Sequence, residues 1–228
     1  MPPAYYSRGP FRSNGKIYMR FGEKFYTCSA TVVPSRSHQV ILTAGHCIFD
    51  KKRGFADDVA FIPAAYGQNI PYGFWLGTKI VTTRQWVKSK SRKNDYAAIK
   101  VVSRRGAVGN VVGEIGLALN ADIKKQKVLA LGYPSNLGGA QIMWGCYSRI
   151  LGRDPFLRRK GGKRPIAMGC NMSYGCSGGS WAIQRPNGRY YVNSVSSYFY
   201  TPDRYKNLLF GPYLGKKTKG VIAQANKG

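Results

Sequence analysis

The segment Leu42-Thr43-Ala44-Gly45-His46-Cys47 carries one of only two histidines in the 228-residue chain. The apolar run before it predicts a strand over residues 39–43, so the imidazole would follow the end of a strand. The other histidine, His38, lies in the polar run 35–38, where an exposed residue without a catalytic role is expected. His46 is therefore the candidate for acid–base chemistry.

Short segments rich in β-branched and aromatic residues recur on both sides of this one, about every 10 to 15 residues. No long helical pattern separates them, which is typical of β sandwiches and barrels and predicts an all-β protein. The predicted strands cover residues 16–21, 25–33, 39–43, 59–62, 78–83, 97–102, 127–132, 141–150, 166–170, 180–184 and 190–198. A weak 3.6-residue pattern at 212–225 predicts a short C-terminal helix, and the glycine-rich stretch 106–120 predicts a connector between two β units.

The composition fits a globular domain and excludes disorder, coiled coil and collagen, because 43% of the residues are hydrophobic and 20% are charged. No apolar stretch reaches the length of about 18 residues that a membrane-spanning helix needs, so no membrane span is expected. Residues 1–6 lack a basic segment followed by an apolar one, so no signal peptide is expected within this sequence.

The charge balance is strongly positive, with 36 Lys and Arg against 9 Asp and Glu and a formal net charge of +27. Such a field attracts anionic polymers, whether nucleic acid, acidic polysaccharide or a membrane surface, without choosing among them. A non-specific anionic polymer surface is therefore an expected partner.

Two further segments complete a pattern in chain order. Asn94-Asp95-Tyr96-Ala97-Ala98-Ile99 places an acid just before the alternating apolar strand at 97–102, and the alternative acids Asp57 and Asp58 do not precede that strand. Gly175-Cys176-Ser177-Gly178-Gly179-Ser180 places a serine in a glycine-rich turn. The order His, Asp, Ser, with Cys directly after His and a late Gly-x-Ser-Gly-Gly loop, resembles the chymotrypsin-like (trypsin-fold) serine endopeptidases.

The likeness spans about residues 26–198. Within that superfamily the chain looks similar to secreted microbial enzymes of the glutamyl-endopeptidase type, because of Cys28 and Cys47 around the histidine, the glycine-rich middle, and the run 193–198 after the serine. The resemblance implies two antiparallel six-stranded β-barrels with the active site between them. The first barrel would span residues 1–110 and carry His46 and Asp95, and the second would span 111–228 and carry Ser177.

The resemblance also assigns roles. Ser177 would be the nucleophile, His46 the general base and acid, and Asp95 the carboxylate that orients the imidazole. The backbone N–H groups of Gly175 and Ser177 would form the oxyanion hole. The expected activity is hydrolysis of peptide bonds through an acyl-enzyme in a monomer that acts on protein or peptide substrates, and no metal or organic cofactor is indicated. The rival interpretation is an inactive, basic peptidase-fold protein that binds anionic polymers.

Five cysteines are present and none is spaced as Cys-x-x-Cys, so zinc-ribbon and thioredoxin sites have little support. The resemblance pairs Cys28 with Cys47. The expected second pair is Cys146 with Cys170, which leaves Cys176 free, and a Cys170–Cys176 bridge is the alternative. Disulfides indicate an oxidising compartment and hence a secreted, extracellular protein.

Cys176 stands where trypsin carries the acid that pairs with the freed N-terminus, so activation through that ion pair is not expected here. A thiol there could itself be the nucleophile, but the Gly-x-Ser-Gly-Gly register favours Ser177.

The substrate pocket is less well defined by the sequence. Counting back six residues from Ser177 along the resemblance reaches Asn171, whose neutral side chain disfavours selection of Lys and Arg unless Asp203 reaches the pocket. No histidine lies near 193–195, as glutamate selection would require. The working hypothesis is a small pocket lined by Ser173, Ser194 and Ser196. The backbone of 194–196, which includes Val195, would pair with the substrate as an added strand.

Overall fold

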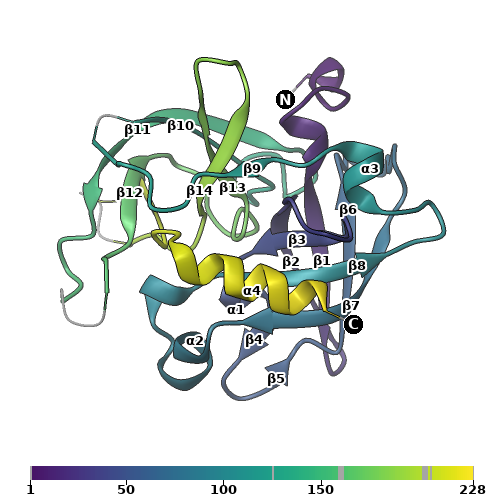
Figure 1. Cartoon of the computed structure of the whole chain (residues 1–228), viewed down its shortest axis with the longest axis horizontal. Helices are drawn as coiled ribbons and strands as arrows, with labels where there is room; N and C mark the ends of the chain where they lie inside the picture. The colour runs from purple at the N-terminus through teal and green to yellow at the C-terminus, as the bar shows by residue number, and fades with distance from the viewer. Residues whose placement is uncertain (1, 125, 159–161, 202–204, 206, 228) are drawn as a thin grey trace.

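The structure is a computed structural model that describes residues 2–124, 126–158, 162–201, 205 and 207–227 (Figure 1). The strands are β1 (Asn14–Phe21), β2 (Lys24–Val32), β3 (Val40–Thr43), β4 (Phe49–Asp50), β5 (Gly54–Phe55), β6 (Asp58–Pro63), β7 (Trp75–Thr82), β8 (Ala97–Val102), β9 (Gly116–Leu117), β10 (Lys127–Gly132), β11 (Trp144–Arg153), β12 (Ile166–Gly169), β13 (Ser180–Gln184), β14 (Tyr190–Val195) and β15 (Leu208–Gly211). The α-helices are α1 (Gly45–Ile48), α2 (Arg84–Ser89), α3 (Val108–Val112) and α4 (Lys216–Asn226), and the 3₁₀ turns are η1 (Pro3–Tyr5), η2 (Phe11–Ser13) and η3 (Arg92–Asn94). Among the described helices, none has both the length and the apolarity needed to cross a membrane.

The first β unit is a closed antiparallel barrel in the order β1-β2-β3-β8-β7-β6. Its strands alternate inward and outward residues, as a sheet with one face on a core requires. On β1 the inward set is Ile17, Met19 and Phe21, all of which are buried. These side chains join one hydrophobic cluster that fills the barrel.

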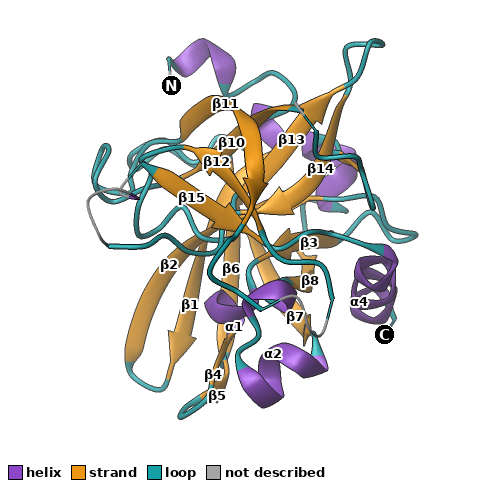
Figure 2. Ribbon diagram, turned by 90° about the vertical axis from the view of Figure 1, so that its left-hand side faces the viewer, coloured by secondary structure: helices purple, strands orange, loops and turns teal. Residues whose placement is uncertain are grey.

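The second β unit is a seven-stranded sheet in the order β15-β12-β11-β10-β13-β14-β9 (Figure 2). All its strand pairs are antiparallel except β9 with β14. The all-β, two-unit architecture is as predicted, but this sheet differs in detail from the expected six-stranded antiparallel barrel. The additional strand β9 is a two-residue strand inside the predicted connector, too short for an alternating pattern to show.

Every predicted strand has a counterpart in the structure, and α4 overlaps the predicted C-terminal helix. The strand β15 was not predicted, nor were the two-residue strands β4 and β5 or the short helices. The two-residue strands and the helices of four to six residues are too short for periodicity to identify.

Both chain ends pack against the unit that is distant in sequence. Helix α4 crosses the outside of the first barrel (Figure 1), and its residues Val221, Ile222 and Ala225 share a hydrophobic cluster with Leu42 of β3. At the other end, the Tyr6 hydroxyl accepts a hydrogen bond from the backbone N–H of Met143, 2.9 Å away. The division between residues 110 and 111 stays a prediction.

Candidate active site

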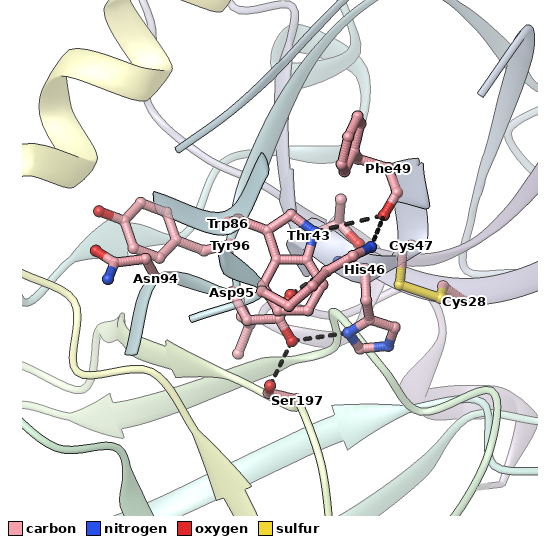
Figure 3. A network of polar contacts seen from close by, with 12 residues as sticks. Cys28, Thr43, His46, Cys47, Phe49, Trp86, Asn94, Asp95, Tyr96 and Ser197 are labelled. Atoms are coloured by element: carbon pink, nitrogen blue, oxygen red, sulfur yellow. Dashed lines mark hydrogen bonds and ion pairs between the residues drawn. A yellow bond between two sulfur atoms is a disulfide. The ribbon is translucent and has the colours of Figure 1, made fainter. Parts of the chain in front are cut away.

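Asp95 and His46 form a two-point contact near the junction of the two units (Figure 3). The Nδ1 atom of His46 lies 2.8 Å from Oδ2 of Asp95, and the backbone N–H of His46 donates to Oδ1, also at 2.8 Å. The hydroxyl of Ser197 donates to Oδ2 at 2.5 Å. Asp95 is buried and His46 is partly exposed. The carboxylate therefore holds the imidazole in one orientation and leaves Nε2 free to accept a proton.

Strand register brings these two residues together across 49 positions of sequence. Strands β3 and β8 are antiparallel neighbours, and Thr43 at the end of β3 pairs with Ala97 at the start of β8. His46 follows the first strand and Asp95 precedes the second. The pairing thus places both residues at the same edge of the first barrel. The alternative acids Asp57 and Asp58 lie beside Arg20 instead.

The electrostatics of the pair favour an ionised Asp95. Burial disfavours the charged imidazole, but the negative charge of Asp95 and its hydrogen bond outweigh that cost and raise the pKa of His46 above its usual 6.5. Burial also opposes the charged carboxylate. The charge and hydrogen bond of His46, with the hydrogen bond from Ser197, nevertheless hold the pKa of Asp95 below its usual 3.8.

Gly45 allows the close packing behind the imidazole. A Cβ atom at this position would lie 2.9 Å from the indole of Trp86 and 3.0 Å from Oδ1 of Asp95. The Trp86 indole lies beside the His46 ring, with 6.2 Å between ring centroids. Only glycine fits this approach without displacing the carboxylate, which explains its place before the histidine.

The loop that carries Ser177 is held so that two backbone N–H groups stay unpaired. The Tyr174 carbonyl accepts from the N–H of Ser135 at 2.6 Å, and the Cys176 carbonyl accepts from the N–H of Gly179 at 3.0 Å. In a trans peptide the C=O and the next N–H point in opposite directions, so these bonds turn the N–H groups of Gly175 and Ser177 away. Neither N–H has a hydrogen-bond partner among the described residues.

Ser29 of β2 fastens this loop to the first barrel. Its N–H donates to the Ser177 carbonyl at 2.7 Å, and its hydroxyl donates to the Gly175 carbonyl at 2.9 Å. The same hydroxyl accepts from the N–H of Tyr133 at 2.9 Å. One buried side chain of the first unit thus ties together two segments of the second.

Two cavities meet at His46 and Ser177. The smaller one, of about 290 Å³, is lined by the loop around Tyr174 and by the segment 197–199, and we call it the small cavity. The larger one, of about 600 Å³, is bounded by the β1–β2 hairpin and by the Cys28–Cys47 region, and we call it the hairpin cavity. Gly175 and Ser177 both line the hairpin cavity. The Ser177 hydroxyl makes no hydrogen bond within the described part of the chain, so no bond to His46 is formed in this structure.

The predicted pocket residues divide into two groups. Ser173 lines the small cavity. Ser194, Val195 and Ser196 are fully buried and line neither cavity. The Ser194 hydroxyl donates to a backbone carbonyl at 2.8 Å, and that of Ser196 accepts from an indole N–H at 3.0 Å.

The segment beside the small cavity lies further along the chain, at Ser197, Tyr198 and Phe199. The carbonyl of Ser197 and the N–H and carbonyl of Phe199 make no backbone hydrogen bond to the described residues. These groups, and not those of 194–196, are available to an extended peptide. Asn171 is exposed and does not line either cavity, and Asp203 lies outside the described residues.

Sequence reasoning missed Ser197, which joins His46 as a second residue that donates to the Asp95 carboxylate. Its signal is ambiguous, because three serines occur within the run 194–197 and nothing local shows which one reaches the carboxylate. Ser29 and Trp86 were also missed, since their partners lie far away in sequence.

The cysteine predictions are confirmed. Cys28 is bonded to Cys47 and Cys146 to Cys170, while Cys176 is a buried free thiol. Burial raises the pKa of the Cys176 thiol to about 12, so it is not a thiolate at neutral pH.

Curated proteins match only part of the chain, and no protein-family model matches it. An extracellular metalloprotease of Bacillus subtilis is 30% identical over 109 residues, which are 47% of this chain and 33% of that protein. A glutamyl endopeptidase of Bacillus licheniformis is 31% identical over 100 residues, which are 43% of this chain and 30% of that protein. The chain thus spans about a third of the length of these curated relatives.

The name of the first of these relatives suggests a metal centre, and the described residues of this chain do not offer a fitting set of ligands. Within the described residues, one group of three potential ligands comes together, formed by Cys28, His46 and Cys47. Both of its sulfur atoms are in the disulfide. Cysteine binds a metal ion as a thiolate, and a sulfur atom in a disulfide is not a thiolate. The imidazole of His46 is therefore the one ligand that this group can offer.

Solved structures match over nearly their full lengths. Protease Anisep from Arthrobacter nicotinovorans has a TM-score of 0.84 and 28% identity, with 96% of this chain and 98% of that chain covered. A thermostable serine protease, AL20, from an extremophilic microorganism has a TM-score of 0.83 and 28% identity, with 99% of both chains covered. The resemblance to the trypsin-like serine proteases that three short segments indicated is therefore confirmed over nearly the whole chain.

Proposed function

We propose that this chain is a serine endopeptidase in which Ser177 attacks the peptide carbonyl, His46 transfers the proton and Asp95 orients the imidazole. The observation that carries the proposal is the two-point contact of Asp95 with His46 at an edge where His46 and Ser177 line the same two cavities. The contact leaves Nε2 as the proton acceptor on that side of the ring.

The steps follow from these positions. Ser177 Oγ forms a bond to the substrate carbonyl carbon while its proton passes to His46, and the imidazolium that forms is stabilised by ionised Asp95. The oxyanion that develops is bound by the unpaired N–H groups of Gly175 and Ser177. His46 then protonates the leaving amine, and an ester to Ser177 remains until water, deprotonated by His46, releases the acid and restores the serine.

The substrate is proposed to be a protein or peptide in extended conformation. Its backbone before the scissile bond pairs with the free groups of Ser197 and Phe199, and the side chain before that bond enters the small cavity beside Ser173.

We further propose that the enzyme acts as an extracellular monomer. Two disulfides and the extracellular relative support that location. Cell fractionation would test it, since the disulfide-bonded protein is expected in the culture medium and a reduced intracellular pool would contradict this.

A fluorophosphonate probe tests the chemistry, because it reacts only with an activated serine. Labelling is expected in the natural protein and in Cys176→Ser, and none in Ser177→Ala. Labelling that persists in Ser177→Ala, or that is absent from the natural protein, would contradict the proposal.

The alternative function is that of a non-catalytic protein that its net charge of +27 retains on anionic polymers. This alternative predicts no labelling together with tight, salt-sensitive binding to such polymers.

A further inference from the structure

The hairpin cavity has an aromatic wall that the proposed chemistry does not use. Phe25 and Tyr26 of β2 line it and are 71% and 38% exposed. Tyr174, at the mouth shared with the small cavity, is 73% exposed. Aromatic side chains normally bury about 150–250 Å² each, so several exposed ones around one cavity mark a binding surface.

Within this wall the ring of Tyr26 is held in place before any ligand arrives. The hairpin pairs Met19 with Tyr26, and the ring of Phe21 meets the ring of Tyr26 edge to face with 5.9 Å between centroids. The guanidinium of Arg53 lies 5.3 Å from the centroid of the Tyr26 ring and donates to its hydroxyl. A ring fixed from both sides loses little conformational freedom when it binds a ligand.

The position of the cavity indicates which part of a substrate would enter it. Residues before the scissile bond lie along Ser197 and Phe199 under the proposed function, on the side of the small cavity. The chain beyond that bond has to leave on the other side of Ser177. Of the described cavities, the hairpin cavity is the other one that His46 and Ser177 both line.

We propose that the hairpin cavity binds the first residues after the scissile bond and selects aromatic or large aliphatic side chains there, with Phe25 and Tyr26 as the specificity-determining residues. This inference rests on the proposed function. Apolar contact with the two rings would favour a large side chain by burying area that a small one leaves exposed.

An acyl-transfer experiment measures the selection of the residue after the scissile bond. It does so separately from the preference for the side chain before that bond. An ester substrate forms the acyl-enzyme, which then reacts either with water or with an added amino-acid amide. In the second case the amine nitrogen bonds to the acyl carbon and passes a proton to His46, which gives it to the departing Ser177 oxygen. The nucleophile alone varies, so the ratio of amide to acid products reports binding in the hairpin cavity.

Phenylalanine amide is expected to capture about tenfold more acyl group than alanine amide at equal concentration, given the apolar area of a benzyl group. The preference should fall toward equality in Phe25→Ser and Tyr26→Ser. Tyr147→Ser is the matched control, because Tyr147 is 69% exposed on β11 and does not line this cavity. Equal capture of both amides by the natural protein would overturn the inference and leave the peptidase proposal intact.

Equilibrium dialysis with the Ser177→Ala protein gives a readout that needs no turnover. The dipeptide Phe-Ala amide is expected to bind more tightly than Ala-Ala amide, and Phe25→Ser added to this background should remove the difference. Preferential binding without fluorophosphonate labelling of the natural protein would sink the peptidase proposal and keep the cavity's selectivity. Equal binding of both dipeptides would count against the selectivity itself.

Discussion

Asp95 holds His46 at two points, since its two carboxylate oxygens accept from Nδ1 and from the backbone N–H, each at 2.8 Å. A single bond would let the imidazole rotate about the contact. Two bonds to the same residue define both where the ring sits and which nitrogen carries the proton.

Asp95→Asn tests this contact. An amide nitrogen facing Nδ1 would favour the tautomer with the proton on Nε2, which cannot accept from Ser177, so kcat should fall by roughly 10³- to 10⁴-fold. Steady-state kinetics on a peptide substrate measure the loss. The control is Asp57→Asn, because Asp57 lies beside Arg20 on the barrel surface and should leave kcat unchanged. A loss of less than tenfold in Asp95→Asn would contradict the orienting role.

The pH dependence of kcat/KM should show an acid limb with a midpoint above 6.5. His46 acts as a base only when neutral, and the charge of Asp95 raises the pKa of His46 above that value despite burial. Activity is therefore lost as pH falls through the raised pKa. A pH–rate profile gives the midpoint, and a midpoint below 6.5 would mean that burial outweighs the carboxylate.

Gly178→Ala is expected to abolish activity and to lower the melting temperature strongly. Gly178 has φ +80°, and a Cβ there would lie 2.0 Å from Thr43 Oγ1 and 2.3 Å from the Ser29 carbonyl, so the loop beside Ser177 must move. Gly188→Ala separates backbone strain from this clash. Gly188 has φ +76° with nothing within 4 Å of an added Cβ, so that variant should lose only about 1 kcal/mol of stability. Equal effects from the two substitutions would refute the steric explanation.

Ser29→Ala should lower kcat by about 10- to 100-fold with little change in KM, because it removes the hydroxyl that holds the Gly175 carbonyl. The loss of two hydrogen bonds should also cost about 1–3 kcal/mol of stability. Thermal melts and kinetics together separate the two effects, with Ser89→Ala, an exposed hydroxyl on α2, as the control. An unchanged kcat in a destabilised Ser29→Ala would assign Ser29 to stability alone.

Cys176 should resist iodoacetamide in the native protein. Its thiol is buried with a pKa of about 12, whereas alkylation requires an accessible thiolate. After unfolding without reductant, mass spectrometry should find the label on Cys176 alone, because the other four cysteines are in disulfides. Rapid labelling of the folded protein would show that the loop opens around the thiol.

The sequence alone determined most of the strands, the order of the three chemical segments and the positions of His46 and Asp95, one after a predicted strand and one before another. These features follow from short-range patterns, namely alternation with a period of two and glycine at turns. The resemblance that those segments carry supplied the Cys28–Cys47 pair.

The tertiary structure alone decided which residues line the two cavities at His46 and Ser177. In the folded chain residues 194–196 are buried and 197–199 lie beside the small cavity, a shift of three residues along a serine-rich run that shows no local difference. The tertiary structure also brings the Ser29 hydroxyl to the Gly175 carbonyl across 146 positions of sequence and joins the β1–β2 hairpin to the cavity at Ser177. Such contacts depend on how two separately patterned sheets pack, and no periodicity within either sheet encodes that packing.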